Sequence, residues 1–410
     1  MVRPKIKISD YSYILPEERI AKYPLECRDA SKLLLYKDGM VKEERFTSLP
    51  SLLPKGSLMV FNETKVVPAR LFFRKSTGAK IEIFCLEPVE PKDYQLAFAS
   101  TRTCKWNVVI GNAKRWREGE IEFFCDQSHT EAKKLNLRAS IVTKEENNGS
   151  VVSFTWDGGA AFSEVLEICG RIPIPPYLKR DTETLDIERY QTLYARIKGS
   201  VAAPTAGLHF TDRVLQEIDK SGITRDTVCL HVGAGTFVPV KSEYIEGHKM
   251  HTEPFTVTKG FIANYLNRPK EGKLIAVGTT SMRTLESLYY IGVHIIRNGH
   301  PGAVEQWEPY DAECDISSEE AMRAIYNYLE DRNIDAITAR TAIIIAPSYK
   351  FRMVDILVTN FHQPQSTLLL LISAFVGDDW REIYRFAMDN GFRFLSYGDS
   401  SLLYRRDGVK

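Results

Sequence analysis

Several features that define common protein classes are missing from this chain of 410 residues. Its seven cysteines are scattered without a CxxC pair, which argues against a disulfide framework or a zinc cluster, so we expect reduced thiols that fill the core. The most apolar stretch, residues 368–375, is too short to cross a bilayer, and no apolar signal segment follows residues 1–5. These absences predict a cytoplasmic protein that does not contact membranes.

Two well-known catalytic motifs are also missing. Without a GxSxG elbow or a phosphate-binding P-loop, acyl-serine hydrolysis and nucleoside triphosphate hydrolysis lose support. The chain also has no large excess of positive or negative charge, because 54 basic and 53 acidic residues leave a net charge of +1. This balance does not decide for or against nucleic acid, since RNA enzymes can concentrate basic residues on one face. With 44% hydrophobic residues, the chain is typical of a globular protein of two domains.

The hydrophobic pattern of the sequence changes in the first half of the chain. From residue 71 to residue 156 nearly every segment is a short alternating strand between turns, with expected strands at 80–84, 94–99, 106–110, 120–124, 137–142 and 151–156. One strand at 58–61 precedes this region, and strands alternating with helices follow it, including strands at 341–346 and 353–358. We therefore predict an α/β domain (1–69 and 158–410) interrupted by a small antiparallel β-barrel (70–157).

Four short segments combine polar side chains with glycine or proline: residues 201–211, 231–240, 276–287 and 360–371. In each of them a strand or coil is expected to pass into a helix, where buried polar groups and free amides can converge on a ligand. This pattern predicts an enzyme that acts on a polar organic substrate.

Histidine is concentrated in this part of the sequence. Five of the eight histidines lie inside or beside the polar segments: His209, His231, His248, His251 and His362. The clustering favours acid–base chemistry, although each histidine taken alone is equally compatible with a hydrogen-bonded structural role. His248 and His251 have an HxxH spacing that suits two metal ligands, but the glutamate of HExxH and a third ligand are both missing. We therefore predict no metal site.

Gly233 and Gly235 follow an expected buried strand at 227–232. A dinucleotide-binding loop would need a third glycine, and a proline stands where its helix should begin. We expect the two glycines to let backbone amides approach a ligand, while Thr236 and Phe237 offer a hydroxyl group and a stacking face. A tight bend between two strands would explain the glycines equally well.

Two expected helix starts are rich in hydroxyl groups. The strand at 274–278 leads into Thr279 and Thr280, with Arg283 one turn inside the following helix. Free N–H groups at such a start favour a carboxylate or phosphate, and an arginine would add a bidentate clamp. A plain N-cap with a surface ion pair is the alternative. Residues 360–367 repeat the pattern, which predicts one shared crevice.

These segments resemble the S-adenosylmethionine:tRNA ribosyltransferase-isomerase family of queuosine biosynthesis. The resemblance runs from residue 8 to residue 399 and covers most of the chain. Its most specific blocks are 61–70 (FNETKVVPAR), 189–194 (RYQTLY), 201–211 (VAAPTAGLHFT), 248–251 (HKMH) and 359–362 (TNFH).

The resemblance implies a two-domain fold in which a β-barrel interrupts an α/β domain. It also implies transfer of the ribosyl part of S-adenosylmethionine to the aminomethyl group of a 7-deazaguanine at the tRNA wobble position. The products are epoxyqueuosine, adenine and methionine. S-adenosylmethionine is then a consumed cosubstrate, tRNA is the partner, and no true cofactor or metal is expected. The oligomeric state stays open, with a monomer favoured.

Site residues follow from the same resemblance. The catalytic candidates are the four histidines His209, His231, His251 and His362, as the acid–base set, and Asp399. The substrate-binding candidates are Asn62, Arg70, Tyr190, Thr205, Gly207, Phe210, Gly233, Gly235, Thr236, Phe237, Thr279, Thr280, Arg283, Asn360, Ser366, Thr367 and Tyr397. Among these, Arg283 is expected to hold the methionine carboxylate, Asp399 to neutralise the substrate amine or sulfonium, and Phe237 or Tyr397 to stack on the flipped base.

The chain departs from the family pattern at three places. Gln365 stands where a lysine is usual and Val238 where an arginine is usual, and residues 295–339 form an extra segment that we expect to be decoration. Two other functions are considered. A methyltransferase would need a glycine-rich loop after its first strand and an acidic residue after its second, and neither is visible. A noncatalytic RNA-binding protein would use the barrel as a platform, but that region lacks an aromatic and basic stripe.

Overall fold

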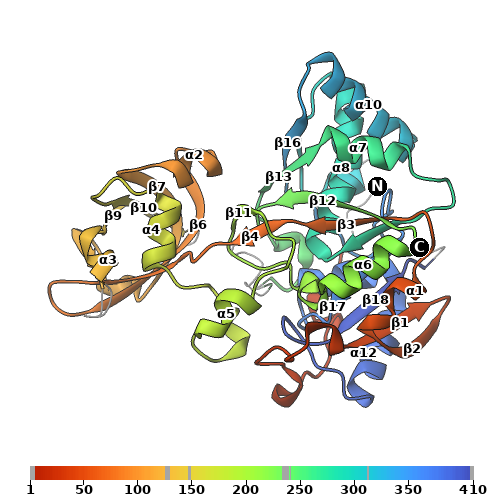
Figure 1. Cartoon of the computed structure of the whole chain (residues 1–410), viewed down its shortest axis with the longest axis horizontal. Helices are drawn as coiled ribbons and strands as arrows, with labels where there is room; N and C mark the ends of the chain where they lie inside the picture. The colour runs from red at the N-terminus through yellow and green to blue at the C-terminus, as the bar shows by residue number, and fades with distance from the viewer. Residues whose placement is uncertain are drawn as a thin grey trace.

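The computed structural model describes residues 5–124, 130–145, 149–232, 240, 242–311 and 314–406. Figure 1 shows two bodies: a barrel on the left and a larger layered body on the right, joined by the chain around β4 (Thr64–Val66) and β11 (Ile197–Ser200). β4 and β11 pair in parallel.

The larger body is built on one sheet of ten described strands. In spatial order these are β15 (Ala303–Val304), β16 (Ala336–Thr341), β13 (Glu253–Thr258), β12 (Thr224–Leu230), β3 (Leu58–Asn62), β14 (Leu274–Val277), β17 (Ile356–Asn360), β18 (Ser400–Tyr404), β1 (Lys32–Lys37) and β2 (Met40–Arg45). The four central strands β12, β3, β14 and β17 run parallel, so their carboxyl ends meet at one edge.

Both faces of this sheet are buried, because alternate residues of each central strand point to opposite sides. In β3, Leu58 and Val60 join the main core, whereas Met59 and Phe61 join a second core on the other face. The main core is completed by α7 (Lys259–Leu266), α8 (Thr279–Asn298), α10 (Ser318–Asp331), α11 (Thr367–Val376) and α12 (Trp380–Asp389). The second core is completed by α1 (Leu49–Leu52) and α6 (Asp212–Lys220).

The extra segment at 295–339 is more than decoration. Its helix α10 packs along α8 and contributes Ala321, Met322 and Ile325 to the main core. The contact is close, since a Cβ on Gly292 of α8 would lie 2.3 Å from the Ala321 carbonyl oxygen. The same segment supplies β15 and most of β16, which extend the sheet.

Six antiparallel strands close the barrel. They are β5 (Arg70–Arg74), β6 (Lys80–Glu90), β7 (Thr103–Gly111), β8 (Glu120–Phe123), β9 (Arg138–Glu145) and β10 (Gly149–Thr155). Phe73, Trp106 and Phe154 are buried within it, and α4 (Phe162–Cys169) packs against the same core through Phe162. The predicted fold class, an α/β domain interrupted by an antiparallel barrel, is confirmed. The exact domain boundaries stay a prediction.

Three local expectations were wrong. Residues 94–99 form a helix, α2 (Tyr94–Ala99), because the Asp93 side chain caps it by accepting from the Leu96 N–H at 3.0 Å. The strand expected at 341–346 ends at Thr341 and begins earlier, at Ala336. Cys27 is exposed, whereas the other described cysteines are buried thiols outside any disulfide.

The remaining described α-helices are short: α3 (Thr130–Lys134), α5 (Thr184–Arg189) and α9 (Glu308–Asp311). Among the 3₁₀ helices, η7 (Thr205–His209) lies beside the site described below. Among the described residues, none of the helices combines the length and apolar character that a bilayer crossing needs. The same residues contain no group of three or more His, Cys, Asp or Glu side chains placed to hold a metal ion.

Candidate functional site

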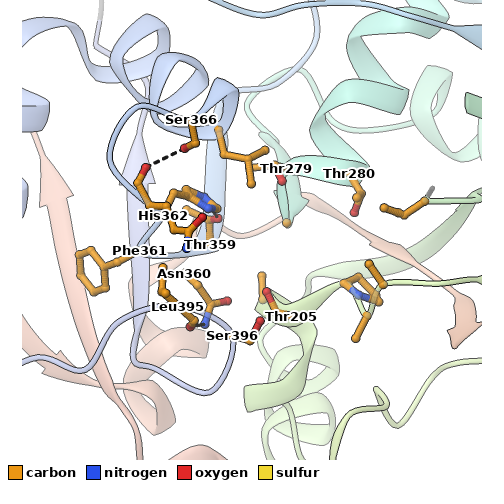
Figure 2. A pocket seen from close by; sticks show the side chains of 18 of the residues that line it. Thr205, Thr279, Thr280, Thr359, Asn360, Phe361, His362, Ser366, Leu395 and Ser396 are labelled. Carbon is orange, nitrogen blue, oxygen red and sulfur yellow. Dashed lines mark hydrogen bonds between the residues drawn. The ribbon is translucent and has the colours of Figure 1, made fainter. Parts of the chain in front are cut away.

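A pocket of about 760 Å³, partly open to solvent, lies beyond the carboxyl ends of β14 and β17. Its walls come from segments that are far apart in the sequence, as Figure 2 shows for Thr205, Thr279, His362 and Ser396. The lining residues are Tyr177, Tyr190, Ala202, Ala203, Pro204, Thr205, Ala206, Val232, Gly278, Thr279, Thr280, Thr359, Asn360, Phe361, His362, Gln363, Ser366, Leu368, Leu395 and Ser396. Its position, beyond the carboxyl ends of parallel strands, is typical of a small-molecule site.

One wall is the N-terminus of the 20-residue helix α8. Gly278 is the N-cap, with φ of 87° and ψ of 156°, a conformation that is essentially restricted to glycine. Because glycine has no side chain, no side-chain cap covers the first amides, and the earliest intrahelical bond runs from the Met282 N–H to the Gly278 carbonyl at 3.1 Å. The N–H groups of Thr279 and Thr280 and the helix dipole therefore favour an anionic group in the pocket.

The opposite wall contains His362, two residues after β17. Its backbone is fixed on both sides, since its N–H donates to the Tyr384 hydroxyl at 3.1 Å and its carbonyl accepts from the Tyr13 hydroxyl. Its Nε2 lies 3.1 Å from the Thr359 hydroxyl. Burial lowers the pKa of His362 to about 4, so the imidazole is neutral at pH 7 and available as a base.

The floor between these walls contains Asn360, whose amide is held in one orientation. Its Nδ2 donates to the Leu395 carbonyl at 3.1 Å and to Nε2 of His209 at 3.2 Å. On the far side of the His209 ring, Nδ1 lies 2.9 Å from the Ser31 hydroxyl. Burial, reinforced by the positive charge of Arg393, lowers the pKa of His209 to about 3.

Three buried polar atoms of the lining residues have no hydrogen-bond partner: the Thr280 hydroxyl, the Tyr190 hydroxyl and Oδ1 of Asn360. An unsatisfied buried polar group costs about 1–3 kcal/mol, so folded proteins rarely leave several in one place. Their convergence on one pocket indicates a site that is completed by a polar ligand.

Aromatic residues also contribute to the lining. Tyr177, Tyr190 and Phe361 line the pocket, and the Tyr177 hydroxyl lies 2.6 Å from the Ser396 hydroxyl. Desolvation raises the pKa of the buried Tyr190 well above its ordinary value, which keeps this phenol neutral. Tyr177 and Tyr190 therefore offer hydroxyl groups to a polar heterocycle, whereas the Phe361 ring packs against Phe392 and Phe394 in the main core.

The pocket brings together seven of the residues that the sequence predicted, from four segments: Tyr190, Thr205, Thr279, Thr280, Asn360, His362 and Ser366. Ser366 is the N-cap of α11 and accepts from the Leu369 N–H at 3.2 Å. The expected shared crevice at two helix starts is therefore present, whereas the roles of the individual residues stay predictions.

Three predicted histidines do not line this pocket. His209 lies behind Asn360, with both ring nitrogens occupied. His231 stacks on Tyr94 of the barrel, with ring centroids 4.6 Å apart and an interplanar angle of 6°, and burial lowers its pKa. The His251 side chain is exposed to solvent.

The two charged residues expected to contact substrate are engaged elsewhere. Arg283 is buried and forms an ion pair with Glu253, so its guanidinium is already neutralised away from the pocket lining. Asp399 accepts hydrogen bonds from the backbone N–H groups of Arg393 at 2.8 Å and Lys32 at 3.2 Å. Its carboxylate therefore links the 393–399 turn to the start of β1. The structure does not support the predicted contacts of these two residues.

Other predicted residues hold the fold together. Asn62 pairs with the backbone of Leu230, donating to its carbonyl at 3.1 Å and accepting from its N–H at 3.0 Å. Arg70 begins the barrel strand β5 and pairs with Glu82. Thr367 is the first residue of α11 and does not line the pocket. None of these three residues lines the pocket.

Three more predicted residues are closely packed against other residues and do not line the pocket. A Cβ on Gly207 would lie 1.8 Å from the Tyr194 hydroxyl, so glycine is required there for space. Phe210 is fully buried in the second core. The buried Tyr397 donates its hydroxyl to Asp186 at 2.8 Å and lines a smaller hollow beside the pocket. Gly233, Gly235, Thr236 and Phe237 lie outside the described residues.

Some lining residues were not predicted. Gly278 stands between a strand and two threonines, and a glycine that replaces a capping side chain there is a readable signal. Gln363 follows His362 directly in the predicted segment. Ala202 and Val232 lie within two of the predicted polar segments, whereas Leu395 and Ser396 lie outside all four, and only the tertiary fold brings them to this edge of the sheet.

Comparison with known proteins gives consistent matches. The family model described as "Queuosine biosynthesis protein" matches residues 8–403. The S-adenosylmethionine:tRNA ribosyltransferase-isomerase of Anaeromyxobacter sp. (strain Fw109-5) is 39% identical over 98% of this chain and 100% of its own length. The enzyme of the same name from Halothermothrix orenii is 38% identical over 97% and 100%. A crystal structure of S-adenosylmethionine tRNA ribosyltransferase from Thermotoga maritima is 26% identical, with 96% and 99% coverage and a TM-score of 0.46.

Proposed function

The chain belongs to the queuosine biosynthesis protein family, and from this premise we propose that the pocket is its active site. The protein is a tRNA-modifying transferase-isomerase of queuosine biosynthesis, like the relatives that it matches along almost their whole length. In this pocket it transfers the ribosyl part of S-adenosylmethionine to a 7-aminomethyl-7-deazaguanine at the tRNA wobble position. Epoxyqueuosine forms, and adenine and methionine leave.

One observation carries the assignment of the site. Unpartnered polar atoms of Thr280, Tyr190 and Asn360 converge on a pocket that also presents an uncapped helix N-terminus and a neutral histidine. A ligand with a carboxylate, a polar heterocycle and acidic C–H groups matches these features. S-adenosylmethionine has all three.

The start of α8 is the proposed carboxylate site. The amides of Thr279 and Thr280 and the positive end of the helix dipole can hold the methionine carboxylate without an arginine. This replaces the role first expected of Arg283, whose charge is matched by Glu253.

His362 is the proposed general base. The sulfonium of S-adenosylmethionine acidifies the neighbouring C5′ hydrogens, and a neutral imidazole can accept one of them as a proton. His362 is the one histidine among the described lining residues, and its low pKa keeps it unprotonated at pH 7. The resulting carbanion beside sulfur is stabilised by the positive charge that it adjoins.

The ligands follow from this chemistry. S-adenosylmethionine is consumed as a cosubstrate, and the reaction needs no resident cofactor or metal. The macromolecular substrate is a tRNA whose wobble base is turned out of the anticodon stack to reach the pocket. A cytoplasmic location is part of the proposal, because tRNA is modified there.

Product analysis tests the function directly. The purified protein should release adenine and methionine from S-adenosylmethionine only when tRNA with 7-aminomethyl-7-deazaguanine at the wobble position is present. Chromatography of the small products and mass analysis of the digested tRNA measure both halves. A tRNA with guanine at that position is the control. Formation of S-adenosylhomocysteine instead of adenine would assign a methyltransferase.

Replacement of Gly278 by alanine tests the carboxylate site. The φ of 87° disfavours any L side chain, so we expect a loss of about 1–3 kcal/mol in stability, or a displaced helix start. Because strain or displacement of the helix start moves the first amides of α8, S-adenosylmethionine binding should weaken by about tenfold or more, as measured by calorimetry. Gly299→Ala is the matched control, because Gly299 ends the same helix with φ of 75°. It should lower the melting temperature without changing the affinity, and equal affinities of both variants would contradict the site.

A further inference from the structure

His209 and Asn360 form a hydrogen-bonded chain whose donors and acceptors are fixed. Nδ2 of Asn360 has two hydrogens, and both are used: one by the Leu395 carbonyl at 3.1 Å and one by Nε2 of His209 at 3.2 Å. Since a carbonyl oxygen only accepts, the amide cannot be reversed without placing Oδ1 against it. Nε2 of His209 must then accept, which leaves the proton on Nδ1, where it faces the Ser31 hydroxyl at 2.9 Å.

The chain is almost entirely buried, and Ser31 and His209 line the smaller hollow beside the pocket. Ser31, His209 and Asn360 are 2%, 5% and 3% exposed. Phe46 covers the His209 ring, with centroids 5.1 Å apart. Burial and the nearby guanidinium groups of Arg393 and Arg28 keep the ring neutral, with the pKa lowered to about 3. A group in this state neither takes up nor releases protons near pH 7.

The free end of the chain is Oδ1 of Asn360. It is buried without a partner on a residue that lines the pocket, where Figure 2 shows the Asn360 side chain near Thr205 and Ser396. Since its orientation is locked, this atom can only accept a hydrogen bond. It therefore selects ligands that present an N–H or O–H there and disfavours ligands that present a carbonyl.

We propose that Asn360 recognises an exocyclic amino group of a purine-type base, and that His209 is a positioning residue that holds the Asn360 amide in its accepting orientation. This inference rests on the proposed function, which brings two such bases to the pocket. One is the adenine of S-adenosylmethionine, and the other is the 7-deazaguanine of the tRNA. Both carry an aromatic amine as the donor. His209 therefore acts through Asn360, without exchanging a proton with the substrate.

The wild-type protein provides the first test. Nitrogen NMR of the histidine-labelled protein should show His209 neutral with the proton on Nδ1, from pH 8 down to about pH 5, since its pKa is about 3. A proton on Nε2, or titration of His209 between pH 6 and 7, would overturn the proposal. This measurement needs neither a variant nor turnover, so it is independent of the proposed function.

Two variants separate positioning from catalysis. His209→Gln keeps an oxygen acceptor near the place of Nε2, whereas His209→Met has a similar length and no comparable acceptor. We expect His209→Met to weaken binding of the amine-bearing ligand by about tenfold, the effect of one hydrogen bond and one unpaired group, while His209→Gln stays within about threefold of wild type. For both variants kcat at saturation and its pH profile should be nearly unchanged.

Calorimetry with two separate probes identifies the base. Binding of S-adenosylmethionine in the absence of RNA measures recognition of the adenine amine. Binding of an anticodon stem-loop with 7-aminomethyl-7-deazaguanine, in the absence of S-adenosylmethionine, measures recognition of the aromatic amine of that base. Weakening of one probe by His209→Met, with rescue in His209→Gln, supports the proposal and names the base. Unchanged affinities for both probes, or a loss of kcat by a hundredfold or more in His209→Gln, would overturn it, because the latter marks an acid or base.

Discussion

Replacement of His362 by alanine should lower kcat by about 10²- to 10⁴-fold, the range that a positioned general base contributes, while S-adenosylmethionine affinity changes little. The imidazole lines the pocket, and backbone hydrogen bonds to Tyr13 and Tyr384 fix its place. No other described lining residue is a histidine. Adenine release in single-turnover experiments measures the chemical step without a contribution from product release.

The pH profile of the wild-type enzyme provides a second test of His362 as the base. A general base works only when it is unprotonated, so activity is lost as the pH falls through its pKa in the free enzyme. For His362 that value is about 4, because burial disfavours the imidazolium, whereas an ordinary histidine would give a limb near 6.5. The acid limb of kcat/KM should therefore lie well below pH 6 in the wild type.

The exposed His251 is the matched control for this experiment. Its side chain is open to solvent and does not line the pocket, so His251→Ala should leave the rate of adenine release within a few-fold of wild type. Near-normal turnover in His362→Ala, or a larger loss in His251→Ala than in His362→Ala, would remove His362 as the base.

The fold class was predictable from periodicity. Alternating apolar residues between turns predicted the barrel, and glycine or hydroxyl residues after buried strands predicted the helix starts at Thr279 and Thr367. The failure at 94–99 has a local cause, because the capping effect of Asp93 outweighed an alternating pattern over six residues. Short segments of that length fit either periodicity, so a single cap decides between strand and helix.

The candidate site was predictable at the level of segments more than of residues. Parallel strands end at one edge, which is why helix starts 88 positions apart, at Thr279 and Thr367, come together. Which side chain then faces the ligand depends on distant partners. Arg283 was expected to face substrate, but Glu253 captures it, and nothing in the local pattern announces that pair.

Glu286 shows the same limit with a larger energetic effect. Two turns inside α8, where the sequence analysis offered a surface ion pair as one alternative, this glutamate is fully buried and receives four hydrogen bonds. The Tyr349 hydroxyl and the Arg352 N–H each donate to Oε2 at 2.9 Å. The N–H groups of Met353 and Val354 donate to Oε1 at 3.1 and 2.9 Å. The carboxylate therefore ties α8 to the loop that enters β17.

Glu286→Ala should consequently lower the free energy of unfolding by more than about 3 kcal/mol, because three backbone N–H groups and one hydroxyl lose their acceptor in a dry interior. S-adenosylmethionine binding should weaken with it, since α8 carries Thr280 and β17 carries Asn360, and both residues line the pocket. Urea unfolding measures the change. Glu319→Ala is the control, because Glu319 is exposed and its pair with Arg323 contributes at most about 0.5 kcal/mol. Equal unfolding midpoints for the two variants would show that the buried carboxylate does not hold these two elements together.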